Sequence, residues 1–329
     1  MLHLNLNVLK ANIALALRKV FITDVLLKSL IVSIWFFTFL GLKVDAQPLS
    51  ANVKDTTSKS KNRKLLCVSA VAGAGYVVTL IELNNLWYSQ SPKSKFHFFN
   101  DNLEWNQMDK MGHFYTSFYL STCGIDLLQW GGLSQKKAIL LDNILGLALL
   151  TPIEIMDGYS SAYGASWGDE VADAAGDVFA YVQYVMWKGI RIYPRFSYHN
   201  TSYSFLRPNI LGSTYAERFL KDYNGQTYWL STPISDWIKN KESKFPKWIG
   251  ISIGYSSIGM VYADQALNES HGYHYYRRCF LSVDIYLSRI KTRNKFVNTL
   301  FYLTNMIHFP LPALEYNTKQ GVIFHPIYF

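Results

Sequence analysis

Charged residues and cysteines are scarce in this chain. Of its 329 residues, 17% are charged, whereas 50% are hydrophobic and 16% are aromatic, a balance between that of a soluble enzyme and that of a polytopic membrane protein. The three cysteines, Cys67, Cys123 and Cys279, lie far apart among apolar or aromatic residues, which fits neither a disulfide framework nor a zinc knuckle. We expect them to be buried as small apolar side chains.

The basic residues are not concentrated in one segment. The net charge is +9, but Lys and Arg are spread over residues 54–64, 136–137, 239–247 and 277–293, without a basic helix. We therefore exclude nucleic acid as a partner and expect attraction to anionic membrane lipid. The sequence also has no phosphate-binding loop, nucleophile elbow or dinucleotide-binding glycine pattern.

The N-terminus has the features of an export signal. Arg18, Lys19 and Lys28 precede an apolar run over residues 29–42, which is shorter than the roughly 20 residues of a transmembrane helix. We predict cleavage after Ala46, with an uncleaved anchor as the alternative. The protein is then exported to the cell envelope, faces the periplasm and is associated with a membrane. No Cys follows the predicted cleavage site, so we expect no lipoprotein anchor there.

Four regions are predicted along the chain. A signal peptide occupies residues 1–46, and residues 47–64, which are polar and free of aromatic residues, form a disordered tether. Residues 65–190 carry helical patterns separated by short loops, which indicate an antiparallel bundle of about four helices. Residues 191–329 contain alternating segments such as 249–262 and form a smaller, β-containing region. The predicted fold class is therefore mainly α.

The predicted helices have recognisable ends. Ser134 and Ser166 are placed as N-caps, and Pro152 is expected to bend its helix. Small residues in the first helix would let a neighbouring backbone approach closely, so we expect that helix to be membrane-associated or deeply buried. The first helix is predicted from residue 65, through the apolar run to residue 81, to an end near residues 87–88. The other three are predicted over residues 106–128, 135–156 and 166–188.

Polar side chains recur at helical spacing in the second predicted helix. Asp109, His113 and Ser117 follow one another at i, i+4 and i+8, so they share one face of an otherwise apolar helix. Lys110 lies beside them. These four residues are the candidates for catalytic roles.

Acidic residues on the next two helices complete the constellation. Glu154 and Asp157 share a face near the end of the third helix, and Asp173 lies on the fourth. Short loops between antiparallel helices would bring them near His113 at one end of the bundle. With His113, these three carboxylates are the candidate ligands of a divalent metal ion.

Three interpretations of this cluster remain open. Burying several carboxylates beside a histidine costs several kcal/mol unless they are paired, hydrogen-bonded or metal-bound. A structural network would satisfy them if Lys110 paired with Glu154 or Asp157. A metal site and acid–base catalysis, with His113 oriented by Asp109 or Asp173, are the two alternatives.

Helix capping offers a simpler role for two of the acids. Ser166 and Asp169 fit a capping box, as do Asn106 and Asp109. In that case Asp169 and Asp109 would satisfy backbone N–H groups in the first turns of their helices.

Several short motifs resemble those of a known family. The chain resembles the YfiM-like family of predicted periplasmic lipoproteins, which carries a domain of unknown function, and more distantly VanZ-like membrane proteins. Its tail is similar to the long form of Bacteroidetes-type envelope proteins. The resemblance covers about residues 106–184 and implies an envelope location and a helical core, while it leaves the activity open. The motifs are Asp109 to Phe114, Ser117, Glu154 to Asp157, Ser166 to Asp169 and Asp173 to Gly176.

Two functions follow from these observations. The first is a membrane-associated envelope protein whose buried Asp/His/Glu cluster is structural. The alternative is a membrane-proximal hydrolase, metal-dependent or acid–base, that acts on a lipid or cell-wall precursor. The C-terminal β region could in addition bind an envelope protein partner. Whether the protein is an enzyme stays open at this stage.

Overall fold

The structure is a computed structural model that describes residues 58–88, 91–240 and 242–329. The predicted signal peptide and most of the predicted tether lie outside the described residues. Residues 58–64, which we expected within the tether, form the first turns of a helix instead.

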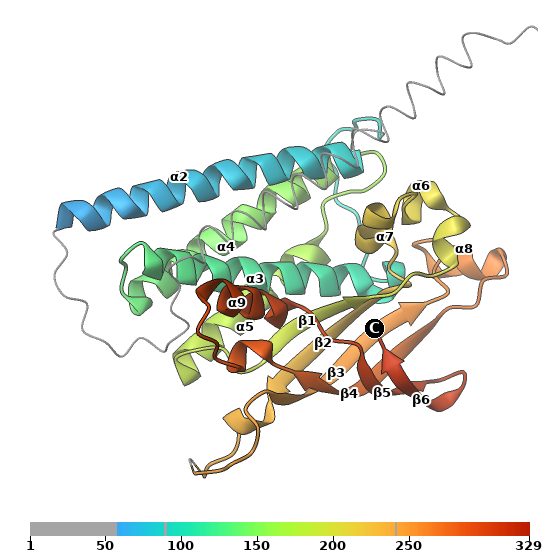
Figure 1. Ribbon diagram of the computed structural model, residues 1–329. Helices are drawn as coiled ribbons and strands as arrows, with labels where there is room; N and C mark the ends of the chain where they lie inside the picture. Colours follow the sequence, from blue (N-terminus) through green and yellow to red (C-terminus); the bar gives the residue numbers. More distant parts are fainter. Residues whose placement is uncertain (1–57, 89–90, 241) are drawn as a thin grey trace, which may run out of the picture.

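Long helices make up the first half of the described chain. Helix α3 packs against both α4 and α5, and α2 lies alongside α4 (Figure 1), where Tyr76 donates a hydrogen bond to the carbonyl of Leu149. The three helices predicted after residue 100 are confirmed within a few residues at each end. The bounds are Ser58–Leu83 for α2, Met108–Trp130 for α3, Gln135–Gly158 for α4 and Trp167–Trp187 for α5, with short helical turns at Asn84–Tyr88 (η1) and Glu104–Gln107 (η2).

The close approach of α3 and α5 depends on a glycine. A Cβ at Gly176 would lie 2.3 Å from the backbone oxygen of Phe114 and 3.0 Å from the Cβ of Ser117. Because no side chain larger than hydrogen fits there, α5 can lie directly on the backbone of α3. This contact fixes the distance between the two helices that carry most of the polar residues.

An antiparallel sheet dominates the second half of the chain. Its strands are β1 Tyr193–Tyr198, β2 Gln226–Pro233, β3 Ile249–Ile258, β4 Tyr276–Ile285, β5 Leu311–Asn317 and β6 Gly321–Tyr328. They pair in chain order, each with its neighbour. Short helices lie in the connections, at Pro208–Leu211 (α6), Tyr215–Lys221 (α7), Gln265–Ser270 (α8) and Lys295–Leu303 (α9), together with turns at Tyr203–Phe205 (η3), Ile234–Asp236 (η4), Leu287–Arg289 (η5) and Thr304–Met306 (η6).

The predicted fold class, a mainly α protein built on a helical bundle with a smaller β region, is wrong. The sheet has six strands and extends over most of the chain after residue 192. Helix α3 packs on this sheet: the ring of Tyr115 contacts the ring of Tyr228 on β2, and Tyr119 donates to the carbonyl of Pro194 on β1. Helix α3 therefore buries tyrosine side chains against strands, in addition to its contacts with α4 and α5.

The sheet curls so that its last strand approaches its second. The hydroxyl groups of Tyr328 on β6 and Thr227 on β2 lie 3.0 Å apart, although β3, β4 and β5 lie between these strands in the sheet. Trp229, Phe280, Ala313 and Tyr328 form a buried cluster on the enclosed face. The sheet thus has a filled inner face of its own.

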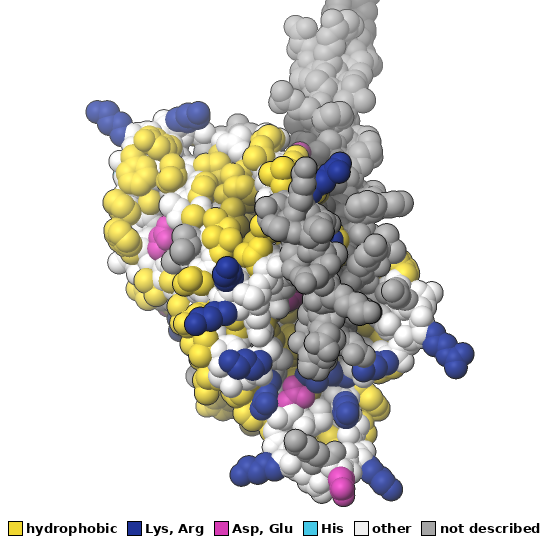
Figure 2. Space-filling view, turned by 90° about the vertical axis from the view of Figure 1, so that its left-hand side faces the viewer, with side chains coloured by type: hydrophobic (Ala, Val, Ile, Leu, Met, Phe, Trp, Pro, Cys, Tyr) yellow, Lys and Arg dark blue, Asp and Glu magenta, His cyan; other side chains and the backbone are white. Residues whose placement is uncertain are grey.

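Apolar side chains remain exposed on the helices. Helices α2 and α4 are each long and apolar enough to cross a membrane, over Arg63–Leu83 and Gln135–Gly158. Among the described residues, the α2 span has no buried part. A deeply buried position for this helix was therefore the wrong alternative. Figure 2, which faces the left-hand side of Figure 1, shows hydrophobic side chains over much of the upper part of that surface.

The expectation that the cysteines are buried is wrong for two of the three. Cys67 and Cys279 are exposed and Cys123 is partly buried. Cys67 lies on the uncovered helix α2, and Cys279 lies on the outward face of β4. Leu66 beside Cys67 is exposed too, whereas Phe280 beside Cys279 is buried on the other face of β4. An apolar neighbour in the sequence therefore did not imply burial of the cysteine itself.

Candidate functional site

An unusual backbone segment leads into α3. Trp105, Asn106 and Gln107 have φ values of 48°, 52° and 63°, in the left-handed region that non-glycine residues rarely adopt. The buried Asn106 donates to Ser257 on β3 and accepts from Gln265, both at 2.8 Å. Contacts with the sheet therefore hold this strained segment and position the first turn of α3.

The proposed capping role of Asn106 is wrong. Helix α3 begins at Met108, and its N-cap is Gln107, whose side chain makes no capping hydrogen bond. The side chain of Asp109 is therefore free to serve the polar cluster rather than the helix end. Its Oδ1 atom accepts a hydrogen bond of 2.8 Å from the hydroxyl of Tyr223, which precedes β2.

Lys110 lies at the centre of the cluster. Its Nζ atom is 2.7 Å from Oδ1 of Asp101 and 2.6 Å from Oδ1 of Asp169. A third carboxylate oxygen, Oδ2 of Asp109, is 3.5 Å away. One ammonium group thus joins the loop before α3, α3 itself and α5. We call the set Asp101, Asp109, Lys110, His113, Asp169 and Asp173 the ion cluster.

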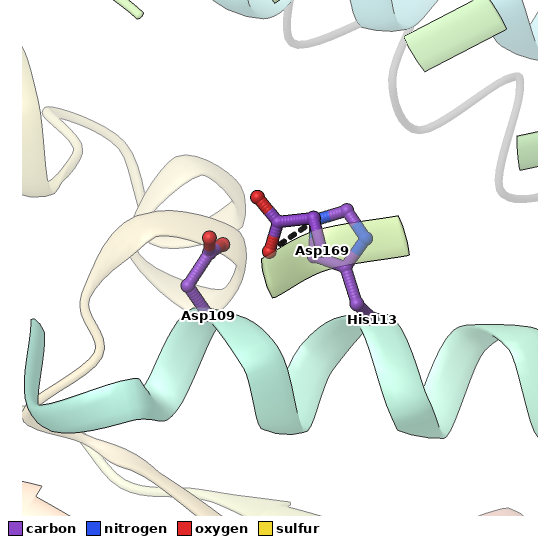
Figure 3. Close-up of side chains that lie close together, drawn as sticks. All are labelled: Asp109, His113 and Asp169. Atoms are coloured by element: carbon purple, nitrogen blue, oxygen red, sulfur yellow. Dashed lines mark ion pairs between the residues drawn. The ribbon is translucent and has the colours of Figure 1, made fainter. Parts of the chain in front are cut away.

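His113 lies between two aspartates of α5. Its Nδ1 atom is 3.1 Å from Oδ1 of Asp173, which is 1% exposed, and its Nε2 atom is 3.6 Å from Oδ1 of Asp169. Figure 3 shows Asp109 and His113 rising from the same side of α3, with Asp169 between them. The i, i+4 spacing therefore placed Asp109 and His113 correctly on one face.

The first turn of α5 is connected to the ion cluster through its cap. Ser166 accepts hydrogen bonds from the backbone N–H groups of Gly168 and Asp169, so it is the N-cap as predicted. The predicted capping box does not form, because the backbone N–H of Ser166 donates to Glu154 Oε2 instead. Asp169 is thereby released to pair with Lys110.

Burial and neighbouring charges shift the pKa values of the ion cluster. Burial would lower the pKa of His113, but the hydrogen bond to Asp173 and the charges of Asp109 and Asp169 raise it to about 10. Burial also lowers the pKa of Lys110 less than the surrounding carboxylates raise it, so it ends above its ordinary value. Both cationic side chains therefore carry their charge at neutral pH.

The pKa values of Asp169 and Asp109 shift in opposite directions. Burial, followed by the charge of Asp109, raises the pKa of Asp169 to about 8. For Asp109, burial acts in the same direction, but His113, Lys110 and the hydrogen bond from Tyr223 outweigh it and lower the pKa. Of these two carboxylates, Asp169 therefore accepts a proton more readily, because its pKa is the higher one.

The residues predicted as metal ligands are only partly brought together. Among the described residues, the potential ligand atoms of Asp109, His113 and Asp169 lie within 4.8 Å of one another. Glu154 instead accepts from the backbone of Ser166, and Asp157 forms a side-chain hydrogen bond with Tyr88.

The donor set itself suits a hard or borderline divalent cation, but Lys110 already supplies a positive charge to Asp169 at 2.6 Å. Fitting a metal ion would require this ammonium group to move away. The residues present therefore fit a metal poorly while Lys110 holds its position.

Ser117 is enclosed rather than open to a substrate. It is 1% exposed, and its hydroxyl donates to the backbone oxygen of Asp173 at 2.6 Å. The exposed side of the ion cluster is formed by Asp109 and His113, whose side chains are 29% and 18% exposed. A molecule approaching the cluster would meet these two residues first.

Sequence reasoning missed two members of the neighbourhood. Asp101 lies in a loop without periodicity, and Tyr223 lies more than a hundred residues from Asp109, so no local pattern pointed to either. Asp169 was recognised only as a capping residue. A signal for it was nevertheless present, since Asp169 and Asp173 share a helical face through their i, i+4 spacing.

Comparison with known proteins identifies one family. Residues 97–185, less than a third of the chain, match the model of a family described as "Predicted periplasmic lipoprotein (DUF2279)". Neither a curated protein nor a solved structure matches the chain. The match confirms the resemblance to predicted periplasmic lipoproteins and supports an exported, envelope location. The YfiM-like identification and the likenesses to the Bacteroidetes-type long form and to VanZ-like proteins stay predictions.

Proposed function

We propose that this chain is a membrane-associated protein of the cell envelope in which the ion cluster has a structural role. The family match over residues 97–185 supports the envelope location. The exposed apolar helices α2 and α4 support contact with a membrane. In this proposal the cluster joins the helices to the sheet and performs no reaction.

The position of the Lys110 ammonium group carries the proposal. It lies 2.6 to 3.5 Å from carboxylate oxygens of Asp101, Asp109 and Asp169, which come from three separate segments. Removing this cation would leave three carboxylates without a compensating charge, and an uncompensated buried charge destabilises a fold. The hydrogen bond from the Tyr223 hydroxyl to Asp109 connects the ion cluster to the segment that leads into β2.

Two substitutions of Lys110 test this role in the full chain, purified in detergent. Lys110→Met removes the cation but keeps an aliphatic side chain, so we expect a loss of about 3–5 kcal/mol of unfolding free energy. Lys110→Arg keeps the charge and should lose much less. Thermal and denaturant unfolding followed by circular dichroism measure both. A Lys110→Met variant as stable as the wild type would remove the proposal.

A second candidate function is acid–base hydrolysis of a lipid or cell-wall precursor. The observation in its favour is the arrangement of His113, whose Nδ1 atom is held by the buried Asp173 while the imidazole and Asp109 remain partly exposed. A histidine oriented in this way by a buried carboxylate, and protonated at neutral pH because its pKa is raised, can donate its proton as a general acid. Asp109 and Lys110 would then orient or stabilise a polar group of the substrate.

The two functions differ in what His113→Gln should do. Gln can still donate a hydrogen bond to Asp173 but cannot exchange a proton in this pH range. If the protein is a hydrolase, the folded variant should lose turnover of labelled envelope lipids or cell-wall precursors, while His271→Gln, in an exposed turn, should keep it. Equal behaviour of wild type and His113→Gln with every precursor would eliminate hydrolysis.

A further inference from the structure

The outer face of the sheet is apolar, whereas its inner face carries charged and hydroxyl groups beside the aromatic cluster. In β4, Phe280 points inward together with Arg278, Ser282 and Asp284, whereas Leu281 and Val283 point outward and are exposed. A one-sided antiparallel sheet in water exposes a polar face rather than an apolar one. The surroundings of this sheet are therefore not simply water.

Beside the aromatic cluster, the inner face carries a network of charged and hydroxyl groups. Arg195 on β1 and Asp284 on β4 form an ion pair of 2.8 Å, with both side chains fully buried. Asp284 also accepts from Ser231 at 2.5 Å, and Arg278 donates to Ser256 at 2.9 Å. These contacts satisfy part of the network, whereas Nε and Nη2 of Arg195 and Nε of Arg278 are buried without a hydrogen-bond partner among the described residues.

The outer face carries a continuous row of apolar side chains. Ile253 on β3 pairs with Leu281 on β4, Leu281 with Leu314 on β5, and Leu314 with Phe324 on β6. Directly paired residues of an antiparallel sheet point to the same side, and these four side chains are 44% to 60% exposed. Ile251 and Val283 form a second paired position beside them. Exposed apolar patches of this extent mark a binding surface.

Strand length and the neighbouring helices indicate what covers this face. Strands β3 and β4 have 10 residues each, which matches the roughly 9–11 residues of a tilted strand that crosses a bilayer, whereas β5 and β6 are shorter, with 7 and 8 residues. The membrane-length helices α2 and α4 expose apolar side chains in the same molecule. An apolar exterior on both the helices and the sheet suits surrounding hydrocarbon better than a single partner protein.

One end of the molecule is basic and complements anionic headgroups. The connections on that side of the sheet, between β2 and β3 and after β4, contain Lys239, Lys244, Lys247, Lys291 and Arg293. Figure 2 faces this end and shows more Lys and Arg than Asp and Glu side chains on it. Juxtamembrane basic residues are attracted to anionic lipid.

Helix ends and aromatic residues belong to the same basic end. The side chain of Gln135, at the start of α4, donates to the carbonyl of Lys188, just after α5, and the rings of Trp187 and Trp237 are in contact. Trp237 and Trp248 are exposed there, as is usual at the boundary between hydrocarbon and headgroups. The ion cluster lies at the opposite end, in the first turns of α3 and α5.

We propose that the outer face of β3–β6 lies against the hydrocarbon of a lipid bilayer, with the basic end at an anionic headgroup layer. This inference rests on the membrane association proposed above. It extends that association from the helices to the sheet. In this inference the outer face of the sheet contacts lipid and does not bind an envelope protein partner.

Fluorescent labels on the sheet test the inference. In the full chain with its three cysteines replaced by serine, Leu281→Cys places a label on the outer face, and Glu242→Cys, in the exposed β2–β3 connection, is the matched control. Both are labelled with an environment-sensitive fluorophore in vesicles of phosphatidylethanolamine and phosphatidylglycerol. Spin-labelled acyl chains report contact with hydrocarbon, and iodide reports contact with water.

We expect acyl-chain quenchers to quench the label at position 281 severalfold more than iodide does, with the reverse at position 242. Quenching at 281 by iodide alone overturns the inference, because the face is then in water. Quenching by neither reagent, together with cross-linking between labelled copies, also overturns it, because a second copy then covers the face.

Carbonate extraction separates the two proposals. Release of the wild-type protein from membranes refutes the membrane association itself, whereas a retained protein with an iodide-accessible label refutes only the placement of the sheet.

Discussion

Tyr223, just before β2, donates a 2.8 Å hydrogen bond to Asp109 on α3, across 114 residues of chain. Through this bond the sheet reaches the ion cluster of the helices. The same aspartate is 3.5 Å from the ammonium group of Lys110, so the cluster belongs to both halves of the fold. A helical bundle considered alone would lack this connection.

Removal of this hydroxyl should destabilise the protein. Tyr223→Phe keeps the ring, which contacts Trp105, but deletes the donor to a charged acceptor. We expect a loss of about 1.5–3 kcal/mol, measured by denaturant unfolding in detergent. Tyr215→Phe, at an exposed ring, is the control and should change stability by less than about 0.5 kcal/mol. Equal effects of the two substitutions would contradict a role for the hydroxyl.

The contribution of His113 to stability should depend on pH. Its pKa is about 10 in the folded protein, against an ordinary value of 6.5. A raised pKa means that the charged imidazole stabilises the fold fully below about pH 6.5 and that this contribution is lost as the pH rises through about 10. The difference in unfolding free energy between wild type and His113→Gln should therefore be larger at pH 6 than at pH 10.5. A difference that does not vary with pH would show that folding leaves the pKa of His113 unchanged.

Metal ions should affect a Lys110 variant but not the wild type. In the wild type the ammonium group pairs with Asp169, so neither a chelator nor added Zn²⁺ or Mn²⁺ should move the melting temperature. Lys110→Ala frees Asp109, His113 and Asp169, whose ligand atoms lie within 4.8 Å of one another. Binding to the folded state then raises the melting temperature of this variant with increasing metal concentration. A wild-type protein stabilised by micromolar metal would favour a metal site over the structural role.

The contact between α3 and α5 should not tolerate a methyl group. In Gly176→Ala the new Cβ would lie 2.3 Å from the backbone oxygen of Phe114, so the helices must separate, at a cost of about 1–3 kcal/mol. Gly75→Ala on α2 meets nothing within 4 Å and should stabilise its helix by up to about 1 kcal/mol. Thermal unfolding of both variants checks the pair, and equal melting temperatures would mean that α5 can shift without cost.

The ion pair inside the sheet should matter more than one near the surface. Asp284→Asn leaves the buried Arg195 without its counter-charge, so we expect a loss of about 3–5 kcal/mol. Asp236→Asn removes the partner of Arg289, which is 31% exposed, and should cost less than about 1 kcal/mol. Unfolding in detergent measures both. A small effect at Asp284 would indicate that the inner face is hydrated.

The sequence by itself determined which residues share a helical face and where several helices begin. The i, i+4 spacing of Asp109 and His113 and the cap at Ser166 are local properties, because they depend on neighbours within a turn of helix. The alternation over residues 249–262 likewise indicated a strand, which the structure contains as β3. Hydrophobic content led us to expect a membrane environment, which stays a prediction. The helical patterns of residues 65–190 predicted a fold class that was too helical.

Only the tertiary structure decided which acids meet the imidazole and which face of the sheet is enclosed. Asp169, rather than Glu154 or Asp157, lies beside His113, because the approach of α5 to α3 at Gly176 sets the relative position of the two helices. Alternation distinguishes two faces but does not say which one is inside, since that depends on the direction in which the sheet curls and on the solvent around it. Those two choices arise from contacts between residues far apart in the chain, which no local pattern contains.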